Sequence, residues 1–171
     1  ADVSQYDAQK KVEGMYTSVS LGLSDTYYAE GTYRRDRSSA LPVDNNSYNY
    51  YSISGSAILS NLIESDLISF AKLRLNHAVV GNDTAPYNVF RAYTINPAIN
   101  GAASASNPST LPNSNLKAET TTENEIGLEI NMLDRKLSFD FSFYNKTTDD
   151  LLTSLGVSPA TGFSGLVTNA G

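Results

Sequence analysis

The sequence contains no cysteine and no tryptophan, and it has a single histidine among 171 residues. The absence of cysteine excludes disulfide bridges and thiolate metal sites, but it leaves the redox environment of the protein open. Negative charge predominates, because 18 Asp and Glu residues outnumber 12 Lys and Arg residues and give a net charge of -6. This balance argues against nucleic acid as a partner.

Long apolar runs are also missing, and no stretch approaches the ~18 consecutive apolar residues of a membrane helix. The chain begins with the polar stretch ADVSQYDAQKK, residues 1–11, so we do not expect a signal peptide there. A membrane β-barrel is still compatible with these features. Its strands present apolar side chains on one face only, so its bulk hydropathy resembles that of a soluble protein.

The stretch ENEIGLEINM, residues 123–132, alternates between acidic and apolar residues with a period of two. A helix would scatter the apolar residues around its axis, so the alternation predicts a β-strand. The next run, residues 137–146, places Leu137 and three phenylalanines opposite Asp140 and its polar neighbours. Only LDRK separates the two runs, and such a short connection predicts a hairpin.

Four earlier runs show the same alternation, within residues 15–23, 27–36, 50–59 and 68–80. Together with the two later runs they predict six strands, each longer than the ~5–6 residues of an average strand. The predicted links alternate in length. SDT, IESD and LDRK are short, whereas residues 37–47, 81–119 and 147–165 are long. Tight turns at one end and long loops at the other are typical of an outer-membrane barrel.

The barrel interpretation gives each face of the strands a role. Lipid offers no partner for stray charges, so the apolar face looks outward and the charged face lines the lumen. We therefore predict an all-β fold, an antiparallel transmembrane β-barrel segment of about six to seven strands. The residues predicted to face the lumen are Glu30, Arg34, Lys72, Arg74, Glu123, Glu125, Glu129 and Asp140.

Two further features follow from these faces. We expect wet, individually weak ion pairs between the lumen glutamates and Arg34, Lys72 and Arg74. Many tyrosines lie near the predicted strand ends, which fits an interfacial aromatic girdle, although Tyr28 and Tyr50 have lumen parity.

The motifs of this chain follow one another in a distinctive order. LKAETT at 116–121 opens a strand that continues with EIGLE at 125–129, and the partner strand ends in YNKTT at 144–148. GMYTSVSLGL, NNSYNYYSISGSAIL and AKLRLNHAVVGND precede them, and SPATGF and NAG follow. This ordered string resembles the barrel of SusC/RagA-type TonB-dependent transporters of Bacteroidetes over nearly the whole chain.

The resemblance implies a barrel of about 22 strands with an N-terminal plug, located in the bacterial outer membrane. It also implies import of glycans or peptides, with a SusD-like surface lipoprotein as a lid and energy delivered through a TonB box. Residues 1–171 would then be part of the barrel domain, without the plug, and roughly a quarter of a full transporter.

The same resemblance supplies the expected partners. These are the rest of the barrel and its plug, the SusD-like lipoprotein, the TonB complex reached through the missing N-terminal part, membrane lipid, and an oligosaccharide or peptide substrate. Nucleic acid is not expected, and neither is a cofactor or a metal ion.

Several polar residues are candidates for more specific roles. The candidate outer-loop residues, placed to touch substrate or the lid protein, are Asp44, Asn45, Asn46, Asn82 and Asp83. Plain turn chemistry is the favoured explanation for them. The run from Arg34 to Arg37 is either a solvated loop edge or a rim charge that orients substrate.

An enzymatic or metal site is not expected. His77 is the only histidine and there is no cysteine, so the residues for a transition-metal centre are lacking. The three lumen glutamates are better explained as a solvated wall than as a calcium site, because alternate carboxylates on a strand lie ~7 Å apart.

An isolated sheet of this kind has two open edges, which lipid does not tolerate. Either the rest of the barrel pairs with those edges, or the chain forms a sandwich-like fold, or copies associate edge to edge and bury the phenylalanines. The functional alternatives to an importer are a secreted all-β glycan-binding module and a surface adhesin. A water-soluble monomer with Ile126 and Phe141 packed between two sheets would support the glycan-binding module.

Overall fold

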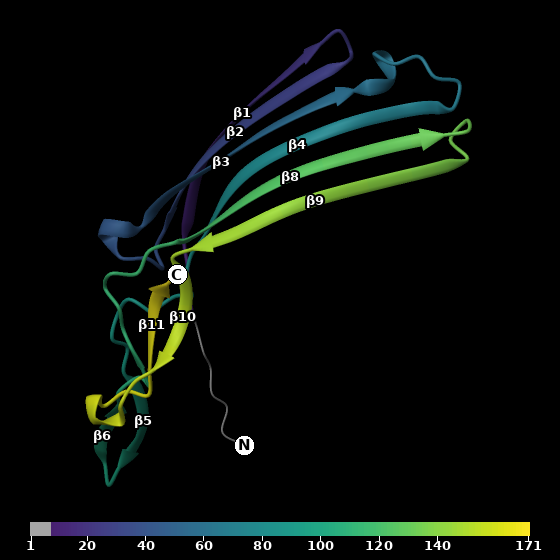
Figure 1. Ribbon diagram of the computed structural model, residues 1–171. Helices are drawn as coiled ribbons and strands as arrows, with labels where there is room; N and C mark the ends of the chain where they lie inside the picture. The colour runs from purple at the N-terminus through teal and green to yellow at the C-terminus, as the bar shows by residue number, and fades with distance from the viewer. Residues whose placement is uncertain (1–7) are drawn as a thin grey trace.

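Residues 8–171 are described by a computed structural model of the chain, and the polar start, residues 1–7, lies outside the described residues. Six long strands form one antiparallel sheet in the order β1-β2-β3-β4-β8-β9 (Figure 1). They are β1 (Val12–Leu23), β2 (Tyr27–Ser38), β3 (Ser47–Ile58), β4 (Ile68–Asn82), β8 (Glu119–Met132) and β9 (Leu137–Asp149). These are the six predicted strands, and the all-β prediction is confirmed.

Each of these strands has 12 to 15 residues, which exceeds the ~9–11 tilted residues that cross a bilayer. Three 3-10 turns also occur: η1 (Val43–Asn45), η2 (Leu59–Asn61) and η3 (Pro159–Thr161). Within residues 8–171 no helix has the length and apolar character to span a membrane.

The links sort by length between the two ends of the sheet, as predicted. Residues 24–26, 59–67 and 133–136 lie at one end, and the long links lie at the other (Figure 1). In the first short link, Ser24 and Asp25 have φ of 53° and 49°. Left-handed φ values at both central residues are those of a type I′ turn, and the Thr26 amide donates to Leu23 O over 3.1 Å, so residues 23–26 reverse the chain in a tight turn.

The long links contain strands that the sequence analysis missed. β5 (Thr94–Ile99) and β6 (Ala102–Ser106) form a separate hairpin, and β7 (Thr110–Leu111), β10 (Leu151–Gly156) and β11 (Gly165–Ala170) form a small sheet in the order β10-β11-β7. β11 contains the LVTNA stretch, and it pairs with β10 and β7. The main sheet of the described chain therefore has six strands and not seven.

The end of β4 corrects one boundary. Asn82 was placed in a polar loop, but the ladder between β4 and β8 continues as far as the Asn82–Glu119 pair. The Asn82 side chain also donates to Glu119 Oε1 over 2.8 Å. Asn82 is therefore the last residue of a strand, and the loop begins at Asp83.

The buried apolar core lies among the long links. Leu41, Val89, Leu116 and Ala118 form it, and Leu116 is 0% exposed. Asn169 on β11 fixes the neighbouring backbone, because its side chain accepts from Lys117 N over 2.9 Å and donates to Lys117 O over 3.0 Å. The long links are thus a packed structure that holds β11 against the approach to β8.

Replacing Leu116 by alanine should loosen this core locally. Such a change at a fully buried leucine costs about 2–5 kcal/mol, so amides in β7, β10 and β11 should exchange with deuterium faster. Exchange in the middle of the six long strands should be unchanged. Leu62→Ala is the control, because Leu62 is 53% exposed. Equal exchange in both variants would contradict a core at Leu116.

Candidate functional site

The polar face of the six-stranded sheet is the candidate site. Strand register fixes this face, because cross-strand partners in an antiparallel ladder point to the same side. One row runs Ser20–Glu30–Ser54–Asn76–Glu125–Tyr144 across all six strands. The eight residues predicted from sequence to face the lumen all have this parity, so the structure brings them onto one surface.

Arg74 is the centre of charge on this face. Its Nη2 lies 2.7 Å from Asp140 Oδ1 and its Nη1 lies 3.5 Å from Glu129 Oε2. The guanidinium passes directly over Gly127, where an added Cβ would lie 3.0 Å from Nε. Gly127 therefore interrupts the row of acids because the arginine that pairs with those acids occupies the space above it.

These ion pairs are wet. The side chain of Arg74 is 32% exposed and that of Asp140 is 57% exposed, so water screens the attraction and each pair contributes little to stability. Glu123 pairs with Lys146 over 3.8 Å, and Glu125 accepts from the Ser142 hydroxyl over 2.9 Å.

Two expected pairings differ from the structure. Arg34 does not reach a glutamate, because its Nε binds Asp36 Oδ1 on the same strand at 2.8 Å. Lys72 makes no ion pair within residues 8–171, although Glu129 is its cross-strand neighbour. Lys72 instead lines a hollow on this face.

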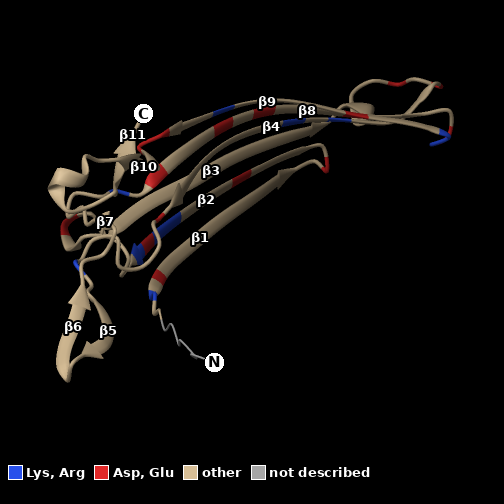
Figure 2. Ribbon diagram, turned by 90° about the horizontal axis from the view of Figure 1, so that it is seen from below, with Lys and Arg blue, Asp and Glu red and all other residues tan. Residues whose placement is uncertain are grey.

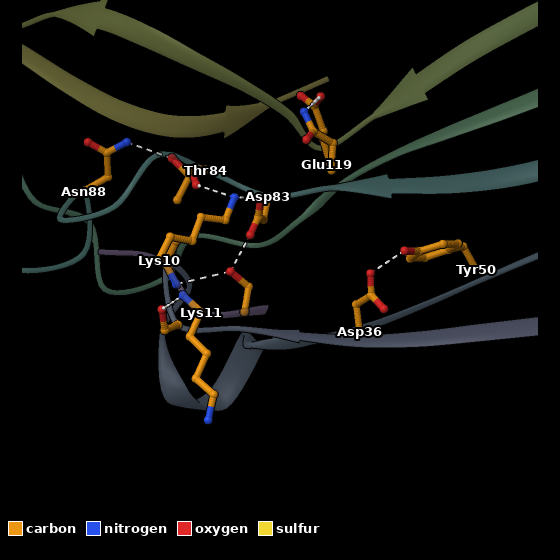
Figure 3. Close-up of polar contacts among 12 residues, drawn as sticks. Lys10, Lys11, Asp36, Tyr50, Asp83, Thr84, Asn88 and Glu119 are labelled. Atoms are coloured by element: carbon orange, nitrogen blue, oxygen red, sulfur yellow. Dashed lines mark hydrogen bonds and ion pairs between the residues drawn. The ribbon is translucent and has the colours of Figure 1, made fainter. Parts of the chain in front are cut away.

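Asp36 is the centre of a second polar cluster, near the long links. It is 4% exposed. It accepts hydrogen bonds from Arg34 and from the Tyr50 hydroxyl, and Figure 3 shows the contact with Tyr50. The Arg34 guanidinium carbon also lies 5.7 Å from the centroid of the Tyr50 ring. A buried carboxylate requires such donors to offset its lost hydration.

Asp83 forms a third cluster, which joins distant segments. It accepts from Lys10, which precedes β1, and from Ser38, the last residue of β2 (Figure 3). The carboxylate side chain is 6% exposed. Of the other candidate outer-loop residues, Asp44 in η1 is exposed, while Asn45 and Asn46 are half-buried.

A hollow of about 460 Å³ lies on the polar face. Small residues of β1 and β3 line it, together with charged residues of β2, β4 and β8. Its polar lining residues are Ser20, Tyr28, Glu30, Ser54, Ser56, Lys72, Arg74, Asn76 and Glu125. The hollow offers hydrogen-bond donors, acceptors and both signs of charge, which suits a polar solute. In the described part of the chain no three His, Cys, Asp or Glu residues are grouped to hold a metal ion.

The opposite face is apolar and uncovered. Leu21, Ile53, Phe141 and Phe143 are 67%, 61%, 61% and 74% exposed. The small sheet and the β5–β6 hairpin lie beyond the strand ends and not over this face (Figure 1). The sandwich-like alternative is therefore not formed by the described residues.

A belt of polar and aromatic contacts borders this apolar face toward the long links. The rings of Tyr51 and His77 have centroids 5.8 Å apart, and His77 Nδ1 lies 2.8 Å from Asn124 Oδ1. The Tyr33 hydroxyl donates to Asn49 Oδ1 over 3.0 Å. Sequence reasoning gave His77 no role, although its parity with Leu75 already placed it on this face.

A single sheet that is polar on its hollowed face and apolar on its uncovered face is the wall of a membrane β-barrel. Comparison with known proteins gives the family. Residues 2–171 match the family model described as "TonB dependent receptor-like, beta-barrel", so the chain belongs to this family.

Two relatives come from Formosa agariphila. TonB-dependent receptor P39 is 29% identical over 170 residues, a match that covers 94% of this chain and 16% of the relative. TonB-dependent receptor P3 is 26% identical over 175 residues, covering 98% of this chain and 17% of the relative. The chain therefore spans only a small part of the length of the curated relatives it matches.

A solved structure titled "Structure of the RagAB peptide transporter" matches with a TM-score of 0.86 and 26% identity, covering 95% of this chain and 18% of that one. The resemblance to SusC/RagA-type TonB-dependent receptors is thereby confirmed. The family consists of outer-membrane receptors and transporters and not of enzymes, and the chain is a segment of such an outer-membrane β-barrel.

Removing the central arginine should have a small effect on stability. Because its pairs are exposed to water, Arg74→Met should lower the free energy of unfolding by less than about 1 kcal/mol. Denaturant titration of the membrane-inserted receptor measures this change. A loss above about 3 kcal/mol would contradict a solvated polar face, since only a dry, buried network is so sensitive.

Introducing a charge should discriminate between the two faces. Phe141→Lys places an ammonium in the apolar face, where it costs about 2–4 kcal/mol at mid-bilayer, so less folded receptor should reach the membrane. Ser142→Lys is the matched control one residue away, on the polar face beside Glu125, and it should insert normally. Quantitative immunoblots of membrane fractions measure both. Equal yields would show that Phe141 does not face lipid.

Proposed function

We propose that this chain is a wall sector of an energy-coupled outer-membrane importer and that it has no enzymatic role. The polar face lines the lumen, and the long-link end faces the outside of the cell. The observation that carries the proposal is the segregation of charge by an unbroken strand register. Every mid-strand charge lies on the hollowed face, while the apolar face stays uncovered.

The rest of the receptor is the first partner of this sector. β1 and β9 are the edges of the sheet, and their free backbone groups need further strands before lipid can surround them. We propose that residues 1–171 belong wholly to the barrel domain. The neighbouring β-strands and a plug domain then come from other parts of the same protein. This completes the barrel without edge-to-edge pairing of copies.

The proposed mechanism for this sector is passive enclosure. The glycines, serines and mixed charges that line its hollow hold a polar solute weakly through many replaceable hydrogen bonds. Weak binding suits a lumen wall, because a transported molecule must leave as readily as it enters. The plug and the TonB complex move the solute, and they act outside this chain.

The proposed substrate is an oligopeptide, with an oligosaccharide as the alternative. The similarity to the RagAB peptide transporter favours a peptide. So does the presence of Lys72, Arg74, Glu30 and Glu125 around one hollow, because a peptide carries both signs of charge at its ends. A SusD-like surface lipoprotein is the proposed lid over the long links, where the exposed Asp44 is available for contact.

An uptake assay tests the proposal. Deletion of the receptor, or loss of the TonB complex, should abolish energy-dependent uptake of labelled oligopeptides and leave passive entry of small solutes unchanged. If deletion blocks oligosaccharide uptake instead, the alternative substrate class is correct. Unchanged uptake of both classes would contradict an importer.

A pair of adjacent substitutions connects uptake to the hollow. Ser54→Trp fills the hollow and should lower oligopeptide uptake several-fold at normal receptor levels. Ile53→Trp places the same side chain on the apolar face, where Ile53 is 61% exposed, and should leave uptake unchanged. The same loss in both variants would show that the hollow is not on the transport path.

A further inference from the structure

Charged residues on the apolar face of β1 and β2 occur only next to the long links. Strand register places Arg35 opposite Met15 and Asn49, and Arg37 opposite Glu13 and Ser47. Their neighbours Arg34 and Asp36 point to the polar face, as their contacts with Tyr50 show. Alternation along the strand therefore directs Arg35 and Arg37 outward.

These outward guanidinium groups have no partner in the described chain. Both residues are exposed, and within residues 8–171 neither makes an ion pair or a side-chain hydrogen bond. Lys11 is nearby and binds Glu13 over 2.6 Å. Lys11, Arg35 and Arg37 against Glu13 leave a net charge of +2 on this patch. Figure 2 shows the basic residues of β2 gathered at this end, beside the start of β1.

The surroundings of the patch define what can bind it. Asn49 lies level with Arg35, its cross-strand partner, and it accepts a hydrogen bond from the Tyr33 hydroxyl over 3.0 Å. Below Tyr33 lies the apolar wall that contains Val19 and Leu21, 60% and 67% exposed. Tyrosines are enriched at membrane–water interfaces, and Tyr33 lies between the charged patch and the apolar wall. The patch is therefore at headgroup height, on the lipid side of the wall.

The chemistry of arginine narrows the choice of ligand. A guanidinium presents a planar fork of donors that matches a phosphate group in two parallel hydrogen bonds. Arg35 and Arg37 are two residues apart on one strand and thus ~7 Å apart, which is close enough for both to reach one phosphorylated headgroup. Acyl chains of the same molecule would extend down the apolar rows of β1–β3.

We propose that Arg35 and Arg37, supported by Lys11, bind the phosphate of an outer-leaflet lipid and fix the height of this wall in the membrane. This proposal rests on the barrel assembly and orientation proposed above, since these place the long-link end outside. It also assigns the two outward arginines a role other than orienting substrate. A solute inside the lumen is separated from them by the sheet itself.

The experiment uses the full-length receptor and lipid A as the probe, in its phosphorylated form and in a form whose phosphates have been removed. Native mass spectrometry in detergent counts bound lipid, and titration gives the affinity. The wild type should bind the phosphorylated form more tightly than the dephosphorylated form. Arg35→Gln combined with Arg37→Gln should weaken binding of the phosphorylated form by about tenfold and remove this preference.

Two matched variants distinguish bidentate hydrogen bonding by the guanidinium groups from nonspecific electrostatic attraction. Arg35→Lys with Arg37→Lys keeps the charge but loses the bidentate geometry, so its affinity should be intermediate. Arg135→Gln with Lys136→Gln removes two cations at the short-turn end and should leave lipid A binding unchanged. An equal loss in this control would overturn the proposal, because the effect would then be nonspecific.

The outcomes also distinguish a failure of the proposed phosphate site from a failure of the proposed barrel assembly. Heat-modifiable electrophoretic mobility reports whether each receptor variant is a folded barrel. A folded wild-type receptor that binds both lipid A forms equally would overturn the phosphate site alone. A wild-type receptor that never forms a barrel would overturn the proposed function together with this inference. Binding of a protein partner at Arg35 and Arg37 without any lipid preference would also contradict it.

Discussion

The central constraint on this chain is that backbone N–H and C=O groups have no water to bond in lipid. Each strand therefore needs hydrogen-bonding partners on both sides. The ladders from β1 to β9 provide them within the sheet, and the outer edges of β1 and β9 need further strands. Once the register is fixed, the side-chain period of two decides to which face of the sheet each side chain points. A slip of one residue would place Glu125 and Glu129 on the apolar face and the phenylalanines on the polar face.

The two faces consequently obey different energetics. On the polar face, Arg74 and its carboxylates are solvated. They make the surface charged but contribute little to the free energy of folding. On the apolar face, stabilisation comes from lipid and not from the chain, which explains why large side chains such as Phe143 stay exposed. Within residues 8–171, the hydrophobic core lies among the long links around Leu116, where burial of apolar side chains stabilises the fold.

The two ends of the sheet also differ in their polar chemistry. At the short-turn end, left-handed residues such as Ser24 simply reverse the chain. At the long-link end, Asp36 and Asp83 are buried and surrounded by donors from separate segments. These carboxylates connect the strand ends to one another, and this leaves Arg35 and Arg37 as the outward charges of β2. The same alternation thus produces a structural cluster on one side and a free basic patch on the other.

Much of this arrangement was predictable from the sequence, because alternation and link length are local signals. They identified the six strands, the hairpin at LDRK, and the shared face of Glu30, Arg74 and Asp140. The short strands β5, β6, β7, β10 and β11 were missed, since their sequences lack a clear period and the pairing of β7 with β11 is nonlocal. Sequence determined which face each side chain takes. Only the tertiary structure decided which side chains meet, such as Arg74 over Gly127 and Asp83 with Lys10, because those contacts depend on distances between segments that are remote along the chain.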